Sequence, residues 1–178
     1  MNLRLKRTPG IYLVGFMASG KTTVGRHLAH QIGWDFFDTD AEIEAAEKMP
    51  IAEIFSSRGE PEFRRIENLI ITQHVRCIER GRPAVLALGG GAFAQASNRD
   101  LLRNNGITVW LDCPFEVVDR RVAEAAGPVR PLARDPRQFR GLYDARREAY
   151  GMADVRVAIE SDDPEQTVTA ILADPLFQ

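Results

Sequence analysis

The sequence predicts an α/β fold of three layers, in which helices cover both faces of a five-stranded parallel sheet. Two observations support this prediction. Short apolar runs alternate with helical patterns along the chain, and a glycine-rich loop pattern follows the first apolar run. The chain has 178 residues, of which 44% are hydrophobic and 27% charged, an ordinary composition for one soluble domain. We therefore expect residues 1–178 to form a single domain.

The predicted elements follow one another as strand and helix. The strands are apolar runs, and the helices show apolar residues at helical spacing or begin at a proline. The expected strands are 11–14, 34–38, 83–88, 107–111 and 155–159. The expected helices are 23–32, 41–48, 51–55, 62–79, 98–104, 114–125, 138–150 and 164–172. The segment 127–136 is rich in Gly, Pro and Arg, and we expect it to be a mobile loop.

Residues Gly15 to Thr22 fit the pattern G-x-x-x-x-G-K-[ST] directly after the first strand. Glycines allow backbone N–H groups to turn toward a polyphosphate, and the following helix adds the positive end of its dipole. Lys21 supplies a cation, and Thr22 can offer its hydroxyl to the Mg²⁺ that a nucleotide carries. A chance junction of strand, turn and helix is the alternative. The complete pattern in this context favours binding of a nucleoside triphosphate.

Asp38 and Asp40 flank Thr39, where the second strand ends and a helix begins. One of the two is explained by capping of the helix N-terminus, for which Asp is favoured. The pair together suits a division of labour near a nucleotide-bound Mg²⁺. One carboxylate would orient the ion, and the other would receive a proton from an attacking hydroxyl.

Phe63 to Glu67 lie in a predicted helix, where Arg64 and Glu67 are spaced to share one face. They form either a simple helical ion pair or a grip for a substrate carboxylate, and the residues alone leave both interpretations open. Gly89 to Gly91 follow a buried strand. Three glycines cost backbone entropy, so close approach of the backbone to a ligand is the favoured interpretation.

Two further arginines have an ordinary and a functional interpretation. Arg130 lies in the mobile segment 127–136, where it is either solvated or part of a lid that closes over a transferring phosphoryl group. Arg146 lies four residues before Tyr150 and could equally be a solvated helix charge.

Bulk properties exclude several classes of protein. The net charge is −2 and the isoelectric point about 6.0, so a strongly basic nucleic-acid footprint is not expected. No apolar stretch has the length of a membrane span or of a signal peptide, which predicts a cytoplasmic protein without a membrane partner. Cys77 and Cys113 are far apart and are expected to be reduced, buried thiols.

Taken together, these residues resemble the shikimate kinase family. The resemblance runs from Ile11 to about Ala173. It rests on Gly15 to Thr23, Phe37-Asp38-Thr39-Asp40, Ile54-Phe55, Gly59-Glu60, Phe63-Arg64-Arg65-Ile66-Glu67, Leu88-Gly89-Gly90-Gly91, Arg130-Pro131-Leu132, and Arg146 with Tyr150. The phosphate loop alone would match many unrelated families, whereas D-x-D, F-R-R-x-E and G-G-G in this order are far more specific.

The resemblance implies transfer of the γ-phosphate of ATP to the 3-hydroxyl of shikimate, in aromatic amino-acid biosynthesis. It also implies a P-loop kinase fold like that of nucleoside monophosphate kinases, with a substrate-binding subdomain at about 39–67 and a lid at about 127–136. The small-molecule partners would be shikimate and ATP with Mg²⁺, and we expect a monomer.

The resemblance assigns roles to individual residues. The expected ATP-binding residues are Ala18, Ser19, Gly20, Lys21, Thr22, Thr23, Arg121 and Arg130. The expected shikimate-binding residues are Asp40, Phe55, Phe63, Arg64, Glu67, Gly89, Gly90, Gly91 and Arg146. Thr22 and Asp38 would serve Mg²⁺, and Asp40, Lys21 and Arg130 would act in catalysis.

The chain departs from the family pattern at two places. Ala18 stands where many members carry glycine, which is tolerable if this residue has a negative φ. After the last strand, some members place a basic residue near the adenine, whereas this chain reads Ser161-Asp162-Asp163. No adenine contact is carried over to that segment, and Arg121 is the expected adenine neighbour.

Other functions compete with this interpretation. A P-loop kinase for another small hydroxylated acid, such as gluconate, or for a nucleoside monophosphate would also use Arg64 and Arg146 on an anionic acceptor. A nucleotide-dependent switch without catalysis is the non-enzymatic alternative. The presence of Lys21, Asp40 and Arg130 argues against the switch, since an inactive module would be expected to have lost such a position.

Overall fold

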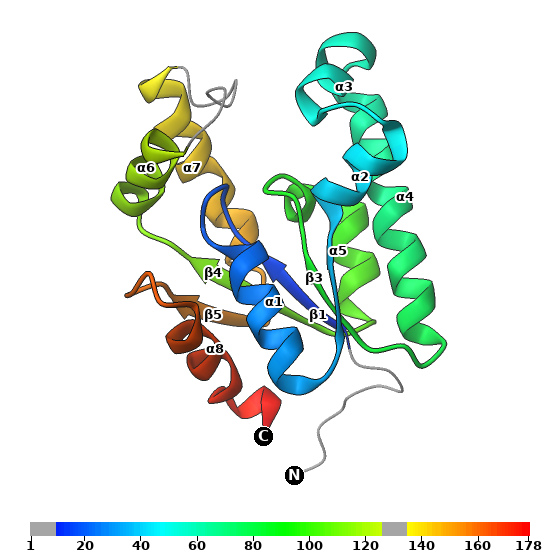
Figure 1. Ribbon diagram of the computed structural model, residues 1–178. Coiled ribbons are helices and arrows are strands. Elements are labelled where there is room, and N and C mark those ends of the chain that lie inside the picture. Colours follow the sequence, from blue (N-terminus) through cyan, green and yellow to red (C-terminus); the bar gives the residue numbers. More distant parts are fainter. Residues whose placement is uncertain (1–9, 126–134) are drawn as a thin grey trace.

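The computed structural model describes residues 10–125 and 135–178 (Figure 1). Five strands form one sheet in the order β2-β3-β1-β4-β5, and every neighbouring pair is parallel. The strands are β1 (Gly10–Val14), β2 (Asp35–Asp38), β3 (Ala84–Ala87), β4 (Ile107–Asp112) and β5 (Val155–Ala158). The predicted five-stranded parallel sheet is confirmed.

Helices cover both faces of this sheet, so the predicted three layers are also confirmed. In Figure 1, α1 and α8 lie on the face toward the viewer, and α4, α5 and α7 lie behind the sheet. The helices are α1 (Lys21–Ile32), α2 (Thr39–Glu47), α3 (Ile51–Arg58), α4 (Glu60–Glu79), α5 (Ala96–Arg103), α6 (Phe115–Glu124), α7 (Pro136–Tyr150) and α8 (Pro164–Leu172). Two single 3-10 turns, Ala92–Ala94 and Pro175–Phe177, were not predicted.

The strand sequences explain the position of each strand in the sheet. Every residue of the central strands β1 and β3 is buried, as expected for parallel strands with helices on both faces. β5 is an edge strand and alternates buried with exposed residues, so Arg156 points to solvent. Because β1, β2 and β3 are parallel, their carboxyl ends meet at one edge of the sheet, where the loops that follow them can form a site.

Aspartates mark the start of three of the helices. Asp38, Asp135 and Asp163 occupy the N-cap positions of α2, α7 and α8, and each carboxylate accepts backbone N–H groups of the first turn. Proline follows the aspartate at α7 and α8, where its missing N–H costs no hydrogen bond. These signals explain why α7 begins at Pro136, two residues earlier than its apolar pattern predicts.

Two apolar cores are present in the described part of the chain. The larger packs the sheet against its helices. The smaller consists of Ile43, Ile54, Phe63 and Ile66, on α2, α3 and α4. In Figure 1, α2 and α3 lie beyond the sheet edge, and with the first turns of α4 they make up most of segment 39–67. The role of this segment as a substrate-binding subdomain stays a prediction.

Some expectations fall outside this fold or differ from it. Cys113 is buried as expected, but Cys77 is exposed, because it lies on the outer face of α4. Most of the expected lid, 127–136, including Arg130, lies outside the described residues. No helix among the described residues is long and apolar enough to cross a membrane.

Two helical glycines give a test of the packing between α1 and the sheet. A Cβ atom on Gly25 of α1 would lie 2.4 Å from the Phe36 ring and 3.2 Å from Leu13, whereas one on Gly141 of α7 would meet nothing within 4 Å. We expect Gly25→Ala to lower the free energy of unfolding by about 1–3 kcal/mol through overpacking. Gly141→Ala should raise it by about 0.5–1 kcal/mol, because alanine loses less backbone entropy in a helix. Urea unfolding measures both, and a Gly25→Ala protein as stable as wild type would contradict the packing described here.

Candidate nucleotide and acceptor site

The phosphate loop joins β1 to α1 and is shaped by its glycines. Gly15 has φ 146°, and a Cβ atom there would lie 2.8 Å from the backbone oxygen of Leu111. Gly20 caps α1 with φ 93°. Lys21 lies in the first turn of α1, and its Nζ donates to the backbone oxygens of Gly15 and Phe16, both at 2.8 Å. The loop is therefore wrapped around the lysine amine.

Ala18 does not meet the condition of a negative φ under which alanine would be readily tolerated here. Its φ is 58°, in the left-handed region. This conformation costs a residue with a Cβ atom about 1–2 kcal/mol. The Ala18 backbone oxygen accepts a hydrogen bond from Arg121 Nη1 at 2.9 Å. The closure of the loop, supported by this contact, decides the backbone conformation here in spite of the residue type.

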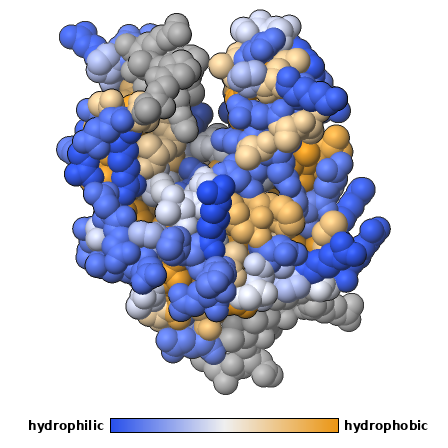
Figure 2. Space-filling model, viewed as in Figure 1, coloured by the Kyte–Doolittle hydropathy of each residue, from blue (hydrophilic) through white to orange (hydrophobic). Residues whose placement is uncertain are grey.

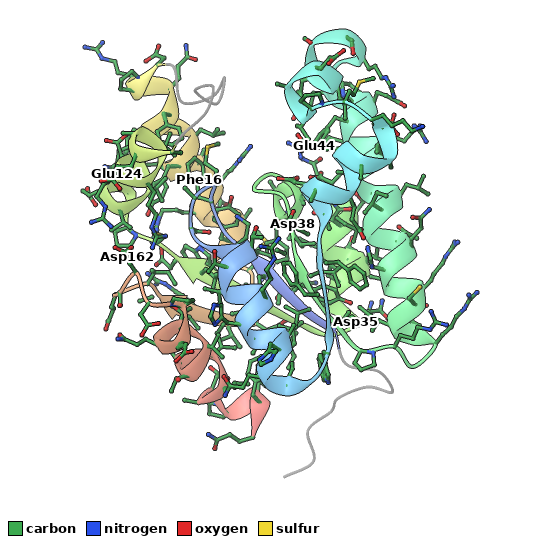
Figure 3. The ribbon with its side chains drawn as sticks, in the orientation of Figure 1. Phe16, Asp35, Asp38, Glu44, Glu124 and Asp162 are labelled. Carbon is green, nitrogen blue, oxygen red and sulfur yellow. The ribbon has the colours of Figure 1, made fainter. Side chains whose placement is uncertain are left out.

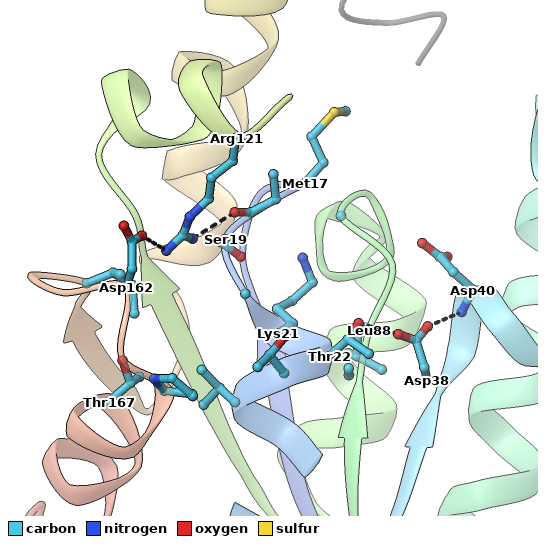
Figure 4. A pocket seen from close by; sticks show the side chains of 18 of the residues that line it. Met17, Ser19, Lys21, Thr22, Asp38, Asp40, Leu88, Arg121, Asp162 and Thr167 are labelled. Carbon is cyan, nitrogen blue, oxygen red and sulfur yellow. Dashed lines mark hydrogen bonds and ion pairs between the residues drawn. The ribbon is translucent and has the colours of Figure 1, made fainter. Parts of the chain in front are cut away.

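Asp38 connects the phosphate loop to α2. Its Oδ2 accepts a hydrogen bond from the Thr22 hydroxyl at 2.5 Å. Its Oδ1 accepts the backbone N–H groups of Asp40 at 3.0 Å and of Ala41 at 3.2 Å. Of the two predicted carboxylates, Asp38 is therefore the one that caps the N-terminus of α2. Asp40 is left with a side chain that lines the cleft (Figure 4).

A cleft of about 910 Å³ lies beyond the carboxyl ends of the strands. Figure 2 shows the surface hollowed between the α6 side and the α2–α3 side. In Figure 3, Asp38 lies at this edge of the sheet, whereas Asp35 lies at the opposite end of β2. The lining includes the phosphate-loop residues from Met17 to Thr23, together with Asp38, Asp40, Gly90, Arg120, Arg121, Glu124 and Asp162.

The three glycines after β3 are the point at which the charged side chains converge. A Cβ atom on Gly89 would lie 2.5 Å from Asp40 Oδ1, and one on Gly91 would lie 2.4 Å from Arg64 Nη2. On Gly90 it would lie 3.3 Å from Arg146 Nη1. Three of the predicted acceptor residues, from α2, α4 and α7, thus come together over one stretch of bare backbone.

Arg64 and Glu67 form the predicted pair on α4. Arg64 Nη1 donates to Glu67 Oε2 at 2.8 Å, and Arg64 also contacts the exposed Glu60 at 3.2 Å. Glu67 is fully buried. Burial raises the pKa of the Glu67 carboxyl to about 7; the Arg64 guanidinium opposes this rise in pKa and the Asp40 carboxylate adds to it.

Aromatic side chains complete the acceptor side. The ring centres of Phe55 and Phe63 lie 4.5 Å apart, and the Arg64 guanidinium carbon lies 5.1 Å from the centre of the Phe63 ring. The Tyr150 hydroxyl donates to the Gly90 backbone oxygen at 2.5 Å. Burial raises the pKa of Tyr150 to about 12, so this hydroxyl remains a donor at neutral pH.

Thr39 has a structural role that its sequence pattern does not indicate. Its hydroxyl is completely buried, accepts the Gly89 backbone N–H at 3.1 Å and donates to the Ala87 backbone oxygen at 3.3 Å. Thr39 thereby joins the start of α2 to the glycine segment. Its position between Asp38 and Asp40 was the only available signal, and a threonine there is equally typical of an ordinary helix start.

The far end of the cleft is built by α6 and the segment after β5. Arg121 Nη2 donates to Asp162 Oδ1 at 2.6 Å, and Arg120 Nη2 donates to Asp162 Oδ2 at 2.8 Å. The sequence pattern does not indicate a role for Asp162. Its carboxylate nevertheless accepts a hydrogen bond from Arg121, the residue expected beside the adenine. Figure 4 shows this contact at the end of the cleft remote from Asp40.

This geometry is that of a P-loop kinase, in which a glycine-rich loop leads into α1 beside a cleft at the carboxyl ends of the strands. Comparison with known proteins identifies the family. The family model for shikimate kinase matches residues 17–174. Because this covers most of the chain, the protein belongs to the shikimate kinase family.

Individual relatives agree with this assignment. The chain is 42% identical over 167 residues to a shikimate kinase of Ruegeria pomeroyi, covering 92% of this chain and 83% of the relative. It is 39% identical over 163 residues to that of Persephonella marina, covering 91% and 96%. A shikimate kinase of Acinetobacter baumannii, solved in complex with shikimate, has 36% identity, a TM-score of 0.83 and coverage of 94% and 93%. The chain is accordingly a phosphotransferase that phosphorylates shikimate with ATP in aromatic biosynthesis.

A lysine variant tests the division of the cleft into two sides. Lys21 contacts the phosphate loop and lines the same cleft as Asp40 (Figure 4), whereas Arg64 lies against Gly91. We expect Lys21→Ala to abolish turnover, because the cation that faces the phosphates is lost, while shikimate still binds in the absence of nucleotide. Steady-state kinetics and calorimetry measure the two effects. Comparable loss of shikimate binding in a folded variant would contradict the assignment.

Proposed function

We propose that the chain transfers the γ-phosphoryl group of ATP to the 3-hydroxyl of shikimate, giving shikimate 3-phosphate and ADP. The observation that carries this proposal is that Lys21, Thr22 and Asp40 line one cleft, while Arg64 and Arg146 lie against the glycine segment, whose Gly90 lines the same cleft. We expect the protein to act as a monomer in the cytoplasm.

The nucleotide would lie along the phosphate loop. The backbone N–H groups of residues 18–23 and the amine of Lys21 would hold the phosphates, with the dipole of α1 adding positive potential. Arg121, oriented by Asp162, would lie beside the adenine. Arg130 would act from the lid, outside the described residues.

The oxygens of Thr22 and Asp38 fit Mg²⁺. They are hard donors that already lie in contact at 2.5 Å, and two protein ligands leave coordination positions for water and phosphate oxygens. No group of three or more His, Cys, Asp or Glu side chains that could hold a metal occurs within the described ranges, which suits an ion that arrives with the nucleotide. When bound, Mg²⁺ would neutralise charge on the phosphate oxygens.

The acceptor would bind between the glycine segment and the charged cluster. Arg64 and Arg146 would hold the shikimate carboxylate through charge-assisted hydrogen bonds. The bare backbone of Gly89 to Gly91 would allow the ring to approach closely. Phe55 and Phe63 would line the apolar side of the pocket.

Asp40 would act on the reacting hydroxyl. The hydroxyl oxygen forms a bond to the γ-phosphorus while the bond from phosphorus to the bridging β–γ oxygen breaks, and the hydroxyl proton passes to the Asp40 carboxylate. In a loose transition state, little covalent assistance is needed. Holding the hydroxyl in line with the phosphorus would then account for much of the contribution of Asp40.

A substrate panel tests the proposal. Release of ADP would be measured with shikimate, gluconate and AMP as acceptors. We expect turnover with shikimate alone. Turnover with gluconate or AMP instead would support the competing kinase functions, and binding of ATP without turnover on any acceptor would support a nucleotide-dependent switch.

Arg64 and Asp40 should fail in different ways. Arg64→Ala removes a bidentate charge-assisted contact remote from the reacting atoms, so shikimate affinity should fall by about 2–4 kcal/mol. Asp40→Asn keeps the shape but is no longer a base, so turnover should fall by roughly 10²–10⁴-fold, nearer the lower value if positioning dominates. Steady-state kinetics beside calorimetric binding separate the two effects.

A neighbouring arginine provides the control. The side chain of Arg65 is 64% exposed and pairs with Glu62 on the outer face of α4. Arg65→Ala should leave both shikimate affinity and turnover close to wild type. Unchanged shikimate affinity in Arg64→Ala, or near-normal turnover in Asp40→Asn, would remove the role given to that residue.

A further inference from the structure

Glu67 carries a buried oxygen that the ion pair with Arg64 does not explain. Its Oε2 accepts from Arg64 Nη1 at 2.8 Å, but its Oε1 is buried without a hydrogen-bond partner among the described residues. The whole residue has no exposed surface. An ionised carboxylate is costly in such a position unless all its acceptor sites are satisfied.

A second carboxyl group lies beside this oxygen. The point at which Gly89 would carry a Cβ atom is 3.1 Å from Glu67 Oε1 and 2.5 Å from Asp40 Oδ1. Two carboxylates that approach the same point repel one another, which favours a proton on one of them. Asp40 lines the cleft, whereas Glu67 is sealed from it, so the proton belongs on Glu67.

The charges that face Glu67 come from three helices. Arg64 lies on α4 with its exposed partner Glu60, Asp40 lies on α2, and Arg146 lies on α7, where it also faces Tyr150. The glycine segment that completes the enclosure contributes backbone only. Apart from the exposed Glu60, ionised Glu67 and Asp40 together neutralise the two guanidinium groups. A proton on Glu67 leaves the cluster with one net positive charge.

We propose that Glu67 takes up a proton when the carboxylate of the acceptor binds, so that this residue sets the charge of the acceptor site and favours anionic acceptors. The inference rests on the proposed function, in which Arg64 and Arg146 hold that carboxylate. An additional negative charge beside Arg64 weakens the hold of the guanidinium on Glu67. Protonation of Glu67 then releases Arg64 for the acceptor and removes the repulsion between Glu67 and Asp40.

The sign of the pH dependence follows from this linkage. The pKa of Glu67, raised to about 7 by burial, would rise further when an anion binds nearby. Below pH 7 the proton is already present, and shikimate affinity should not change with pH. Above pH 7 a proton must be acquired on binding, so Kd should increase by up to about tenfold per pH unit.

Calorimetry measures the proton directly. Shikimate would be titrated into the nucleotide-free protein in phosphate, HEPES and Tris, whose ionisation enthalpies differ, and the dependence of the observed heat on the buffer gives the number of protons bound. We expect uptake of about half a proton at pH 7, approaching one at pH 8. In Glu67→Gln the uptake should vanish, and any remaining shikimate binding should be independent of pH.

A matched variant separates Glu67 from its neighbour. Glu60 contacts the same arginine, but its side chain is 61% exposed, so Glu60→Gln should retain the proton uptake of wild type. Undiminished uptake in Glu67→Gln, or uptake lost in Glu60→Gln alone, would overturn the inference.

The wild-type protein provides a second test if Glu67→Gln fails to fold. A shikimate Kd that stays constant from pH 6 to pH 9, without proton uptake, would contradict the inference while leaving the proposed function intact. Absence of shikimate binding at every pH would instead remove the proposed function on which the inference depends.

Discussion

The carboxylate of Asp38 is the contact on which the arrangement of the site depends. One oxygen accepts the Thr22 hydroxyl at the start of α1, and the other accepts two backbone N–H groups at the start of α2. This side chain therefore links the helix that would bind phosphate to the helix that carries Asp40. It does so although β3 lies between β1 and β2 in the sheet.

The glycine segment after β3 is the second requirement of this geometry. Side chains from α2, α4 and α7 approach the backbone of Gly89 to Gly91 so closely that a Cβ atom at the first or third position would overlap them. Thr39 holds the segment in place through the Gly89 N–H. The three glycines serve first to admit protein side chains, and an acceptor bound there would share the space that those side chains define.

Local patterns made much of the fold and site predictable. The phosphate loop, the parallel strands and the cap at Asp38 each depend on residues close together in the sequence, so pattern and structure agree. The positive φ of Ala18 does not follow from its residue type, because loop closure decides it. The complete burial of Glu67 and the pairing of Arg121 with Asp162 both depend on contacts between elements that are distant in the sequence. The spacing of residues along the sequence predicts local contacts and does not predict such long-range ones.

The two partners of Arg64 explain how a site already filled with ion pairs can still accept an anion. A guanidinium has five N–H donors, and those on Nε and both Nη atoms are shared between Glu60 and Glu67. Glu60 is largely exposed, so exchange of its weak contacts for a substrate carboxylate costs little. Glu67 is sealed and cannot move aside, but it can change its charge. In the proposed complex, the exposed partner would therefore give way by displacement and the buried partner by protonation, while the guanidinium would keep its orientation toward the acceptor.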